Sequence, residues 1–398
     1  MARAGARPAG AGRRGRRPVG ARRRHASAAP ETVELDVVDL GSGGEGVGRL
    51  DGAVVFVPLT APGDRVLARI VGRRKRFARA ELVELVEPAP VRVEPRCAAF
   101  GTCGGCDWQH LDYRAQLAAK RSALGQALAR IGGVETPDVA EPVPSPAGYG
   151  YRDRVRGTLL GGRFHLRRRG TGEPVAIARC EIADEAINAR LARGFEGEPD
   201  GRVELALDAD APDPVATLRV GEDRATGLGF RQVNPAVAKL LEALLVEDAA
   251  AAGAGVVHDL YCGAGTWTLP VAAALPEARV IGVEAHAGSV GLARRRARAA
   301  GLANVELRHG RVERLLDGLR LAGSTCLVDP PRAGLDEVAL ARLAADPPAT
   351  LLYVSCHPAT LARDLRALDV SHELVHVRPF DMFPQTAHLE CRALLRAR

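Results

Sequence analysis

From about residue 226 to its C-terminus, the chain alternates short apolar runs with segments of helical type. The apolar runs are VVHDL, RVIGVE, NVELRH, STCLVD and LLYVS, and stretches such as LARRRARAA and ATLARDLRAL lie between them. This alternation is typical of a parallel sheet with helices on both faces. Ligands of such sheets bind beyond the carboxyl ends of the strands, so the residues that follow these runs are candidates for a functional site. The sequence therefore predicts a Rossmann-like α/β domain over residues 226–398.

The stretch DLYCGAGTWTL places Gly263 and Gly265 between the end of a strand and a helix. Glycines at this point allow a cofactor to approach the backbone closely. The next strand ends in Glu284, whose carboxylate could accept the two ribose hydroxyls of an adenosine cofactor. Because the spacing departs from G-x-G-x-x-G, S-adenosylmethionine is favoured over a dinucleotide. Asp259 is expected to anchor the loop and the amino-acid end of that cofactor.

Cys356 directly follows the run LLYVS, and Pro358 can begin the next helix. The free N–H groups of a helix N-terminus favour a thiolate, so Cys356 is a candidate nucleophile. The alternative is a small buried side chain, which is what most free cysteines are. Asp329, in LVDPPRAG, ends another strand of the predicted sheet and is expected to face the same crevice.

Residues 1–30 contain nine arginines and no acidic residue. The charge of these arginines is larger than the formal net charge of the whole chain, which is +7, so the rest of the chain is slightly acidic. The segment lacks the apolar region of a secretory signal, and its Gly, Ala and Pro content is typical of disorder. It is predicted to be a disordered basic tail that can hold RNA without selectivity.

Two further domains are predicted between this tail and the α/β domain. Residues 31–90 show short alternating strands separated by Gly-rich or Pro-Gly turns, which indicates a small OB-like β-barrel. Its basic hairpin at 73–79 could contact a phosphate backbone, although a run of charge is more often a solvated face. Residues 91–225 contain a cysteine-rich loop, a helix and then arginine-rich hairpins. They are predicted to form a central β-rich domain with an RNA-facing surface.

Three cysteines stand close together in RCAAFGTCGGC, namely Cys97, Cys103 and Cys106, and Cys180 is the fourth candidate thiolate. Four thiolates can hold zinc or a 4Fe-4S cluster. Zinc ribbons usually carry two C-x-x-C pairs, which this chain lacks, so the cluster is favoured. The radical type of iron-sulfur enzyme uses C-x3-C-x2-C, so a structural cluster is the better interpretation. Free cysteines in a large chain without a signal sequence indicate a reducing cytoplasm.

Six motifs, in order along the chain, carry a resemblance to one family. They are FGTCGGCDWQHL, FRQVNP, DLYCGAGTWTL, LVDPPRAGL, VSCHPATLARD and FDMFPQTAHLE. From about residue 31 onward the chain resembles the 23S rRNA (uracil-5-)-methyltransferases that have a TRAM domain and an iron-sulfur cluster. The resemblance implies that Cys356 is the nucleophile, that Glu390 is the base and that the four cysteines bind the cluster. It assigns contacts with S-adenosylmethionine to Gln232, Tyr261, Glu284 and Asp329.

The implied reaction can be built from elementary chemistry. Carbon 5 of uracil is too weak a nucleophile to take a methyl group from a sulfonium, but addition of a thiolate to carbon 6 makes the ring an enolate that can attack. A base must then remove the hydrogen from carbon 5 so that the thiol can leave. Cys356 and Glu390 supply these two roles, and Asp329 could hydrogen-bond the ring amide. A base splayed out of structured RNA needs a stacking partner, for which Phe230 or Trp267 is the candidate.

Three positions depart from the pattern of this family. His357 stands where Asn is usual, Thr266 where Asn is frequent, and Arg311 where a small acidic or amide residue commonly meets the adenine. None of them removes a group that the reaction needs. The sequence thus predicts a cytoplasmic, monomeric enzyme that makes 5-methyluridine in RNA, with 23S rRNA as its partner and no membrane. The same chemistry on tRNA, and a non-catalytic RNA-binding factor for ribosome assembly, are the alternatives.

Overall fold

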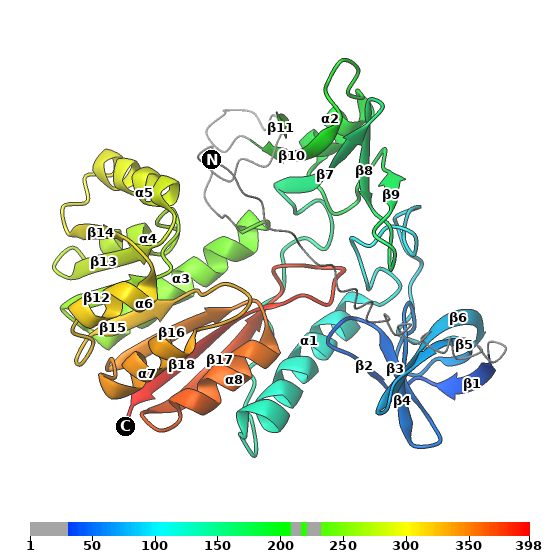
Figure 1. Ribbon diagram of the computed structural model, residues 1–398, viewed down its shortest axis with the longest axis horizontal. Coiled ribbons are helices and arrows are strands. Elements are labelled where there is room, and N and C mark those ends of the chain that lie inside the picture. Colours follow the sequence, from blue (N-terminus) through cyan, green and yellow to red (C-terminus); the bar gives the residue numbers. More distant parts are fainter. Residues whose placement is uncertain (1–30, 208–215, 221–231) are drawn as a thin grey trace, which may run out of the picture.

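The computed structural model describes residues 31–207, 216–220 and 232–398 of the chain. These residues form three sheets that follow one another along the sequence (Figure 1). The basic tail and Phe230 lie outside the described residues, so their roles stay predictions. Among the helices that the structure describes, none is long and apolar enough to cross a membrane.

The first sheet, blue in Figure 1, occupies the region of the predicted N-terminal barrel. Its six strands run in the order β1-β5-β6-β4-β3-β2, and β4 and β6 are parallel neighbours. The strands are β1 (Thr32–Asp36), β2 (Asp39–Leu40), β3 (Gly46–Leu50), β4 (Ala53–Val57), β5 (Arg65–Arg73) and β6 (Phe77–Glu87). Val55 and Val57 alternate with partly exposed residues along β4 and are fully buried, as the two-residue period of a strand requires. The β-rich character is confirmed, and closure into a barrel stays a prediction.

The middle sheet is antiparallel throughout, in the order β11-β10-β7-β8-β9. Its strands are β7 (Arg154–Leu160), β8 (Arg163–Arg167), β9 (Pro174–Ala176), β10 (Gly201–Leu207) and β11 (Ala216–Val220). Helix α2 (Glu185–Ala192) packs on one face, where Ile187 and Leu191 join Leu159 and Leu205 in one core. This sheet is the β-rich centre that the hairpin pattern predicted.

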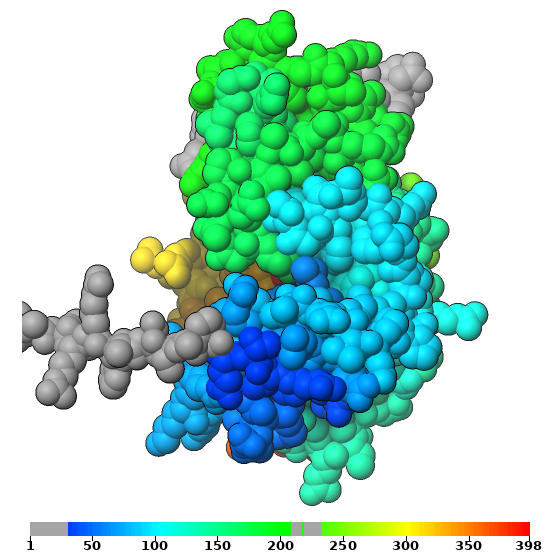
Figure 2. All heavy atoms as spheres, turned by 90° about the vertical axis from the view of Figure 1, so that its right-hand side faces the viewer, coloured from blue at the N-terminus to red at the C-terminus, as the bar shows by residue number. Residues whose placement is uncertain are grey.

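A segment of mixed structure joins the first sheet to the middle one. It carries the cysteine loop, helix α1 (Tyr113–Ala127) and a closing π turn, η1 (Leu128–Gly132). Figure 2 shows the cysteine loop, in cyan, between the blue first sheet and the green middle sheet. Helix α1 packs instead on the third sheet, because Leu124 of α1 and Leu128 of η1 share a core with Leu361 and Val377. The limits 91–225 of the central domain stay a prediction. Helix α1, which lies within these limits, packs in the core of the third sheet.

The third sheet has seven strands in the order β14-β13-β12-β15-β16-β18-β17. The first five are parallel neighbours, and β18 runs antiparallel to both β16 and β17. The strands are β12 (Val256–Leu260), β13 (Arg279–Glu284), β14 (Val305–His309), β15 (Thr325–Val328), β16 (Thr350–Ser355), β17 (His372–Phe380) and β18 (Glu390–Ala397). The five parallel strands are the five predicted apolar runs, so the predicted α/β fold is confirmed.

Helices cover both faces of this sheet. They are α3 (Pro235–Ala252), α4 (Thr268–Ala274), α5 (Ala287–Ala299), α6 (Val312–Leu315) with the 3-10 turn η2 (Leu316–Gly318), α7 (Glu337–Ala345) and α8 (Pro358–Leu368). Along β16, Leu351 and Tyr353 belong to one core cluster, and Leu352 and Val354 belong to the other. A strand that is buried on both faces has no polar side, and this is why its sequence is a continuous apolar run.

Candidate active site

Strand β18 returns beside β16, and their register brings two predicted site residues face to face. The last pair of this ladder is Ser355 with Cys391, and the Cys391 thiol donates to the Ser355 carbonyl oxygen at 3.1 Å. Cys356 directly follows β16, and continuing the register by one residue sets it opposite Glu390, the first residue of β18, whose carboxyl group acts electrostatically on the Cys356 thiol. Directly opposed residues of antiparallel strands have Cβ atoms about 4.5–5.5 Å apart. The fold therefore places the Cys356 thiol beside the Glu390 carboxyl group.

Asp329 joins this pair from a neighbouring strand. It directly follows β15, and its backbone N–H donates to the carbonyl oxygen of the last residue of β12 at 3.4 Å. The indole N–H of Trp267 donates to Asp329 Oδ2 at 2.9 Å and fixes that carboxyl group. Because Trp267 is only 3% exposed, it is not available as the stacking partner that the sequence offered beside Phe230. The predicted nucleophile, base and aspartate thus meet at the carboxyl edge of the sheet.

The Cys356 thiol is held in its protonated form. Burial raises the pKa of Cys356 to about 11, and the carboxyl groups of Glu390 and Asp329 add to this shift, while the guanidinium of Arg332 opposes it. The N-terminus of helix α8, at Pro358, was expected to favour a thiolate. The contribution of the helix end stays a prediction, and in the free protein burial and two acidic neighbours together outweigh the groups that favour the thiolate.

The two carboxyl groups of the site are shifted as well. Burial raises the pKa of Glu390 well above its usual range, and the nearby Asp329 adds to the effect. Burial also raises the pKa of Asp329 to about 6, although the hydrogen bond from Trp267 favours the ionised form. Two like charges cannot both ionise at low cost in one buried site. The arrangement therefore favours a proton on Glu390 while Asp329 carries the negative charge.

His357 caps the helix that follows the cysteine. Its Nδ1 accepts a hydrogen bond from the backbone N–H of Thr360 at 3.3 Å and lies 2.7 Å from the Thr360 hydroxyl oxygen. Burial, together with the charge of Arg332, lowers the pKa of His357, so its ring is neutral and able to accept. Asn, the residue that the family pattern has here, is also a strong N-cap. The histidine therefore keeps the helix start that places Cys356.

The glycine loop after β12 turns sharply under the sheet edge. Tyr261, Gly263 and Gly265 have φ angles of 70°, 56° and 81°, in the region that favours glycine. A Cβ at Gly265 would lie 2.9 Å from a leucine side chain of α4, so only glycine lets the loop pass there. Glu284 ends β13 and accepts the backbone N–H groups of Gly263 at 3.0 Å and of His286 at 2.6 Å. Since each carboxylate oxygen can accept more than one bond, Glu284 can still receive ribose hydroxyls.

Asp259 and Gln232 are both buried. Asp259 is 1% exposed, and its Oδ2 accepts the Thr268 hydroxyl at 2.5 Å, which fixes the start of α4. Burial raises the pKa of Asp259 to about 7, against the Thr268 hydrogen bond and with a contribution from Asp329. Gln232 is 5% exposed and stands three residues before the start of α3. Asp259, at one end of the glycine loop, is therefore bonded to Thr268, at the other end.

The four predicted cluster cysteines line one cleft, which has a volume of about 1500 Å³ and has the glycine loop on its other side. The four are Cys97, Cys103, Cys106 and Cys180. The cysteine loop is joined to the middle sheet by a bridge between Cys103 and Arg168. Asn188 of α2 bonds both the backbone N–H and the carbonyl oxygen of Cys180, at 2.9 and 3.1 Å. The fold thus gathers the distant fourth cysteine with the other three.

The chemistry of this cysteine site fits an iron-sulfur cluster. Burial raises the pKa of Cys106 to about 12, and Cys180 and Cys103 contribute to the shift, so these thiols lie within electrostatic range of one another. In the part of the chain that the structure describes, no group of three or more His, Cys, Asp or Glu side chains is arranged to hold a metal ion. A single zinc ion needs its sulfur ligands about 2.3 Å from one point, whereas in a cluster each thiolate binds its own iron. Four thiolates are a donor set that a 4Fe-4S cluster uses, so the residues present fit that group.

Sequence reasoning missed several contributions to the site. Arg332 is the cation that favours the thiolate of the predicted nucleophile, and its place directly after the DPP motif was a usable signal. Trp267 fixes the aspartate of that motif, which no local pattern shows. Gln116 and Lys120, on the distant helix α1, hold the loop that leads to the predicted base.

These features define the class of the protein. A seven-stranded sheet with one antiparallel strand, a glycine loop after β12 and an acidic residue at the end of β13 form the binding edge of an S-adenosylmethionine-dependent methyltransferase. The sequence profile described as "tRNA (Uracil-5-)-methyltransferase" matches residues 219–398, and that of the TRAM domain matches residues 30–83. The chain belongs to this family of S-adenosylmethionine-dependent RNA uracil-5-methyltransferases that carry a TRAM domain, which confirms the resemblance.

Individual relatives cover nearly the whole chain. An uncharacterized RNA methyltransferase of Thermosynechococcus vestitus is 32% identical over 92% of this chain and 98% of its own length. Another, from Bdellovibrio bacteriovorus, is 33% identical over 92% of this chain and 95% of its own length. Among solved structures, the Pyrococcus abyssi tRNA (uracil-54, C5)-methyltransferase in complex with S-adenosyl-L-homocysteine superposes with a TM-score of 0.65. It is 25% identical and covers 91% of this chain and 100% of its own.

Proposed function

We propose that this protein forms 5-methyluridine in RNA, with Cys356 as nucleophile and Glu390 as base. The observation that carries the proposal is the register of β16 and β18, which sets the two side chains opposite each other beside Asp329. A cysteine next to a carboxyl group, at the edge where the glycine loop can hold a methyl donor, is the set of groups that methylation of carbon 5 needs.

Each step uses a group of this site. Cys356 loses its proton to solvent, and its Sγ forms a bond to carbon 6 of uracil, so that carbon 5 becomes nucleophilic. S-adenosylmethionine supplies the methyl group that carbon 5 takes. Glu390, as the carboxylate, then accepts the proton of carbon 5, the bond between carbon 6 and Sγ breaks, and the thiolate is restored. Asp329, held by Trp267, is placed to accept a hydrogen bond from the ring amide.

The cofactor contacts follow the same proposal. Glu284 would accept the ribose hydroxyls, while Tyr261 and Gln232 would line the site on either side of Gly263 and Gly265. Asp259 acts on the cofactor through the loop that it anchors, since the side chain itself is buried.

We propose that Cys97, Cys103, Cys106 and Cys180 hold a 4Fe-4S cluster with a structural role. The four thiols line one cleft, and four thiolates are the donor set of a 4Fe-4S cluster. Anaerobically purified protein is expected to be brown and to contain about four irons per chain. Stoichiometric zinc without iron would overturn this assignment.

The RNA target is proposed to be 23S rRNA, because the family that the sequence resembles combines a TRAM domain and a cluster site with activity on 23S rRNA. tRNA is the second candidate, and the similarity to the Pyrococcus abyssi tRNA enzyme favours it. We also propose that the protein acts as a monomer in the cytoplasm. Mapping 5-methyluridine in rRNA and tRNA from a deletion strain decides between the targets, since only the true target loses a modified position.

The proposed nucleophile is tested with RNA that carries 5-fluorouridine. Fluorine cannot leave as a proton does, so the covalent complex between the protein and the RNA persists in denaturing gels. Wild-type protein should form this complex when S-adenosylmethionine is present, and Cys356→Ala should not. Cys326→Ala, which removes a buried thiol of β15, is the matched control and should behave as wild type. Absence of the complex with wild type, or its persistence in Cys356→Ala, contradicts the mechanism.

A further inference from the structure

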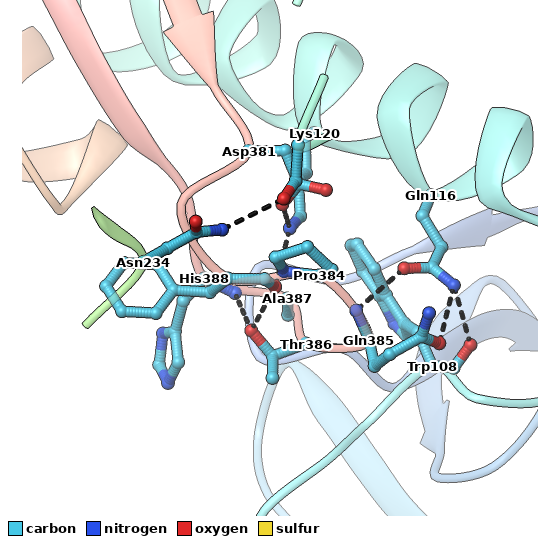
Figure 3. Close-up of polar contacts among 12 residues, drawn as sticks. Trp108, Gln116, Lys120, Asn234, Asp381, Pro384, Gln385, Thr386, Ala387 and His388 are labelled. Carbon is cyan, nitrogen blue, oxygen red and sulfur yellow. Dashed lines mark hydrogen bonds and ion pairs between the residues drawn. The ribbon is translucent and has the colours of Figure 1, made fainter. Parts of the chain in front are cut away.

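The loop from 381 to 389, which joins β17 to β18 and ends directly before Glu390, is held from outside its own sheet. In Figure 1 this red loop reaches out from the third sheet toward the cyan segment that contains the cysteine loop and α1. Its main contacts come from α1, as the close-up in Figure 3 shows. The loop that positions the proposed base is therefore fixed by a part of the chain more than 260 residues away.

Gln116 of α1 makes the first of these contacts. Its Nε2 donates to Gln385 Oε1 at 3.0 Å, and its Oε1 accepts the backbone N–H of Gln385 at 2.9 Å. The same Nε2 also lies 3.1 Å from the carbonyl oxygen of Trp108 (Figure 3) and 3.0 Å from that of Leu111, so its two hydrogens are shared among three acceptors. Gln116 is 0% exposed. Both ends of this buried amide are used to join the loop to residues 97–111, which we call the cysteine segment.

Lys120 makes the second contact, one helical turn further along α1. Its Nζ pairs with Asp381 and donates to the carbonyl oxygen of Phe383 at 3.0 Å (Figure 3). The side chains of Lys120 and Asp381 are 1% and 0% exposed. A buried ion pair adds little to stability compared with apolar side chains of the same size. The effect of this pair that concerns the site is therefore the position in which it holds the loop.

Further hydrogen bonds hold the loop in an unusual conformation. The backbone N–H groups of Asp107 and Trp108 both donate to the Gln385 carbonyl oxygen, at 2.9 and 3.0 Å. The hydroxyl of Tyr151 donates to the Pro384 carbonyl oxygen at 3.0 Å. Gln385 itself has φ of 68°, which a non-glycine residue adopts only where its surroundings impose it. The loop is thus held by α1, by the cysteine segment and by the start of the middle domain.

We infer that Gln116 and Lys120 are positioning residues for the base Glu390, an inference that rests on the proposed function. They fix the loop so that the carboxylate enters β18 opposite Cys356 and reaches the hydrogen on carbon 5. The thiol has its own support in β16 and the cap of α8. Loss of the α1 contacts therefore slows proton removal and leaves addition of the thiol and transfer of the methyl group intact.

The test compares two RNA substrates with Gln116→Met and Lys120→Met. Both variants should still form the covalent complex with 5-fluorouridine RNA at a rate within about threefold of wild type, because this complex forms before proton removal. Turnover of uridine RNA should fall at least about tenfold, as expected when a general base is misplaced. A covalent complex with ordinary uridine RNA should then accumulate to a higher level than with wild type. Ala118→Gln, on the exposed side of the same helix, is the matched control and should match wild type.

The remaining outcomes separate the inference from its alternatives. Equal loss of both reactions shows a structural role, and unchanged turnover shows no role, so either result overturns the inference. Lys120→Met leaves Asp381 buried without its cation and can fail to fold. Gln116→Met introduces no unpaired charge and decides the question alone in that case. If wild type forms no complex with 5-fluorouridine RNA, the proposed function itself fails.

Discussion

At the scale of single residues, the acidity of Cys356 is set by its neighbours. Its pKa of about 11 results from burial and then from Glu390 and Asp329. In Glu390→Gln the repulsion between the thiolate and a carboxylate is removed, so the pKa of the thiol should fall. Alkylation of Cys356 by iodoacetamide, followed by mass spectrometry over pH 7 to 11, should become about tenfold faster at a given pH below the transition.

Glu373→Gln, at an exposed position of the edge strand β17, is the control for this measurement and should leave the alkylation profile unchanged. An unchanged profile in Glu390→Gln would show that the two side chains are not neighbours. Since both groups react in their ionised forms and both have raised pKa values, turnover by the wild type should rise with pH through the neutral range.

At the scale of elements, the start of α8 depends on one side chain. His357→Ala removes the acceptor for the Thr360 N–H and should lower the free energy of unfolding by about 1 kcal/mol. His357→Asn restores an equally good cap and should leave stability unchanged. Urea unfolding measures both, with Arg366→Ala at an exposed position of α8 expected to stay within about 0.5 kcal/mol of wild type. Equal loss in the Asn and Ala variants contradicts the capping role.

A second element is stabilised by a buried carboxylate. Asp64, fully buried in the first sheet region, accepts bonds from the guanidinium of Arg92 at 2.7 and 2.8 Å and from the N–H groups of Ala61 and Ala89. Burial alone would raise the pKa of Asp64, but these bonds hold it below the ordinary value of 3.8. A lowered folded pKa means that the contribution to stability is present above about pH 4 and is lost as the pH falls through the folded pKa.

Asp64→Asn should therefore lower the free energy of unfolding at pH 7 by about 1–3 kcal/mol. The difference between wild type and variant should shrink below pH 4, where the wild-type carboxylate takes up its proton. Chemical unfolding at pH 7 and pH 3 checks this. Asp51→Asn, at an exposed turn, is the control, and a difference that is constant with pH would contradict the assignment.

The element scale also shows what sequence could and could not supply. The five parallel strands were predictable, because burial on both faces leaves continuous apolar runs. The site residues that follow parallel strands were also predictable, because the carboxyl ends of these strands meet at one edge of the sheet, where ligands bind. The raised pKa of Cys356 was not predictable, because it depends on burial and on the position of β18, and both are set by the tertiary structure. The contacts of Gln116 and Lys120 with the loop before Glu390 join residues 269 and 261 positions apart, and no local pattern shows them.

At the scale of the whole molecule, the cysteine segment connects the three sheets. The indole N–H of Trp108 donates to the Gly44 carbonyl oxygen of the first sheet at 3.0 Å, and Asp107 Oδ2 accepts the Ala387 N–H of the loop before Glu390 at 3.3 Å. Arg169, at the end of β8, bonds both Asp107 and the Cys106 carbonyl oxygen. The proposed cluster would thus fix the segment that holds the base loop.

This connection predicts a long-range effect of cluster loss. Cys106→Ser should lower the iron content and speed hydrogen exchange at 381–389, because Asp107 and Trp108 then lose the fixed position from which they bond that loop. Exchange in strands β12 to β14 should not change, since their packing does not involve the cysteine segment. Cys326→Ala, with its iron content intact, controls for loss of a thiol. If iron is lost while exchange at 381–389 stays at the wild-type rate, the position of the base loop does not depend on the cluster.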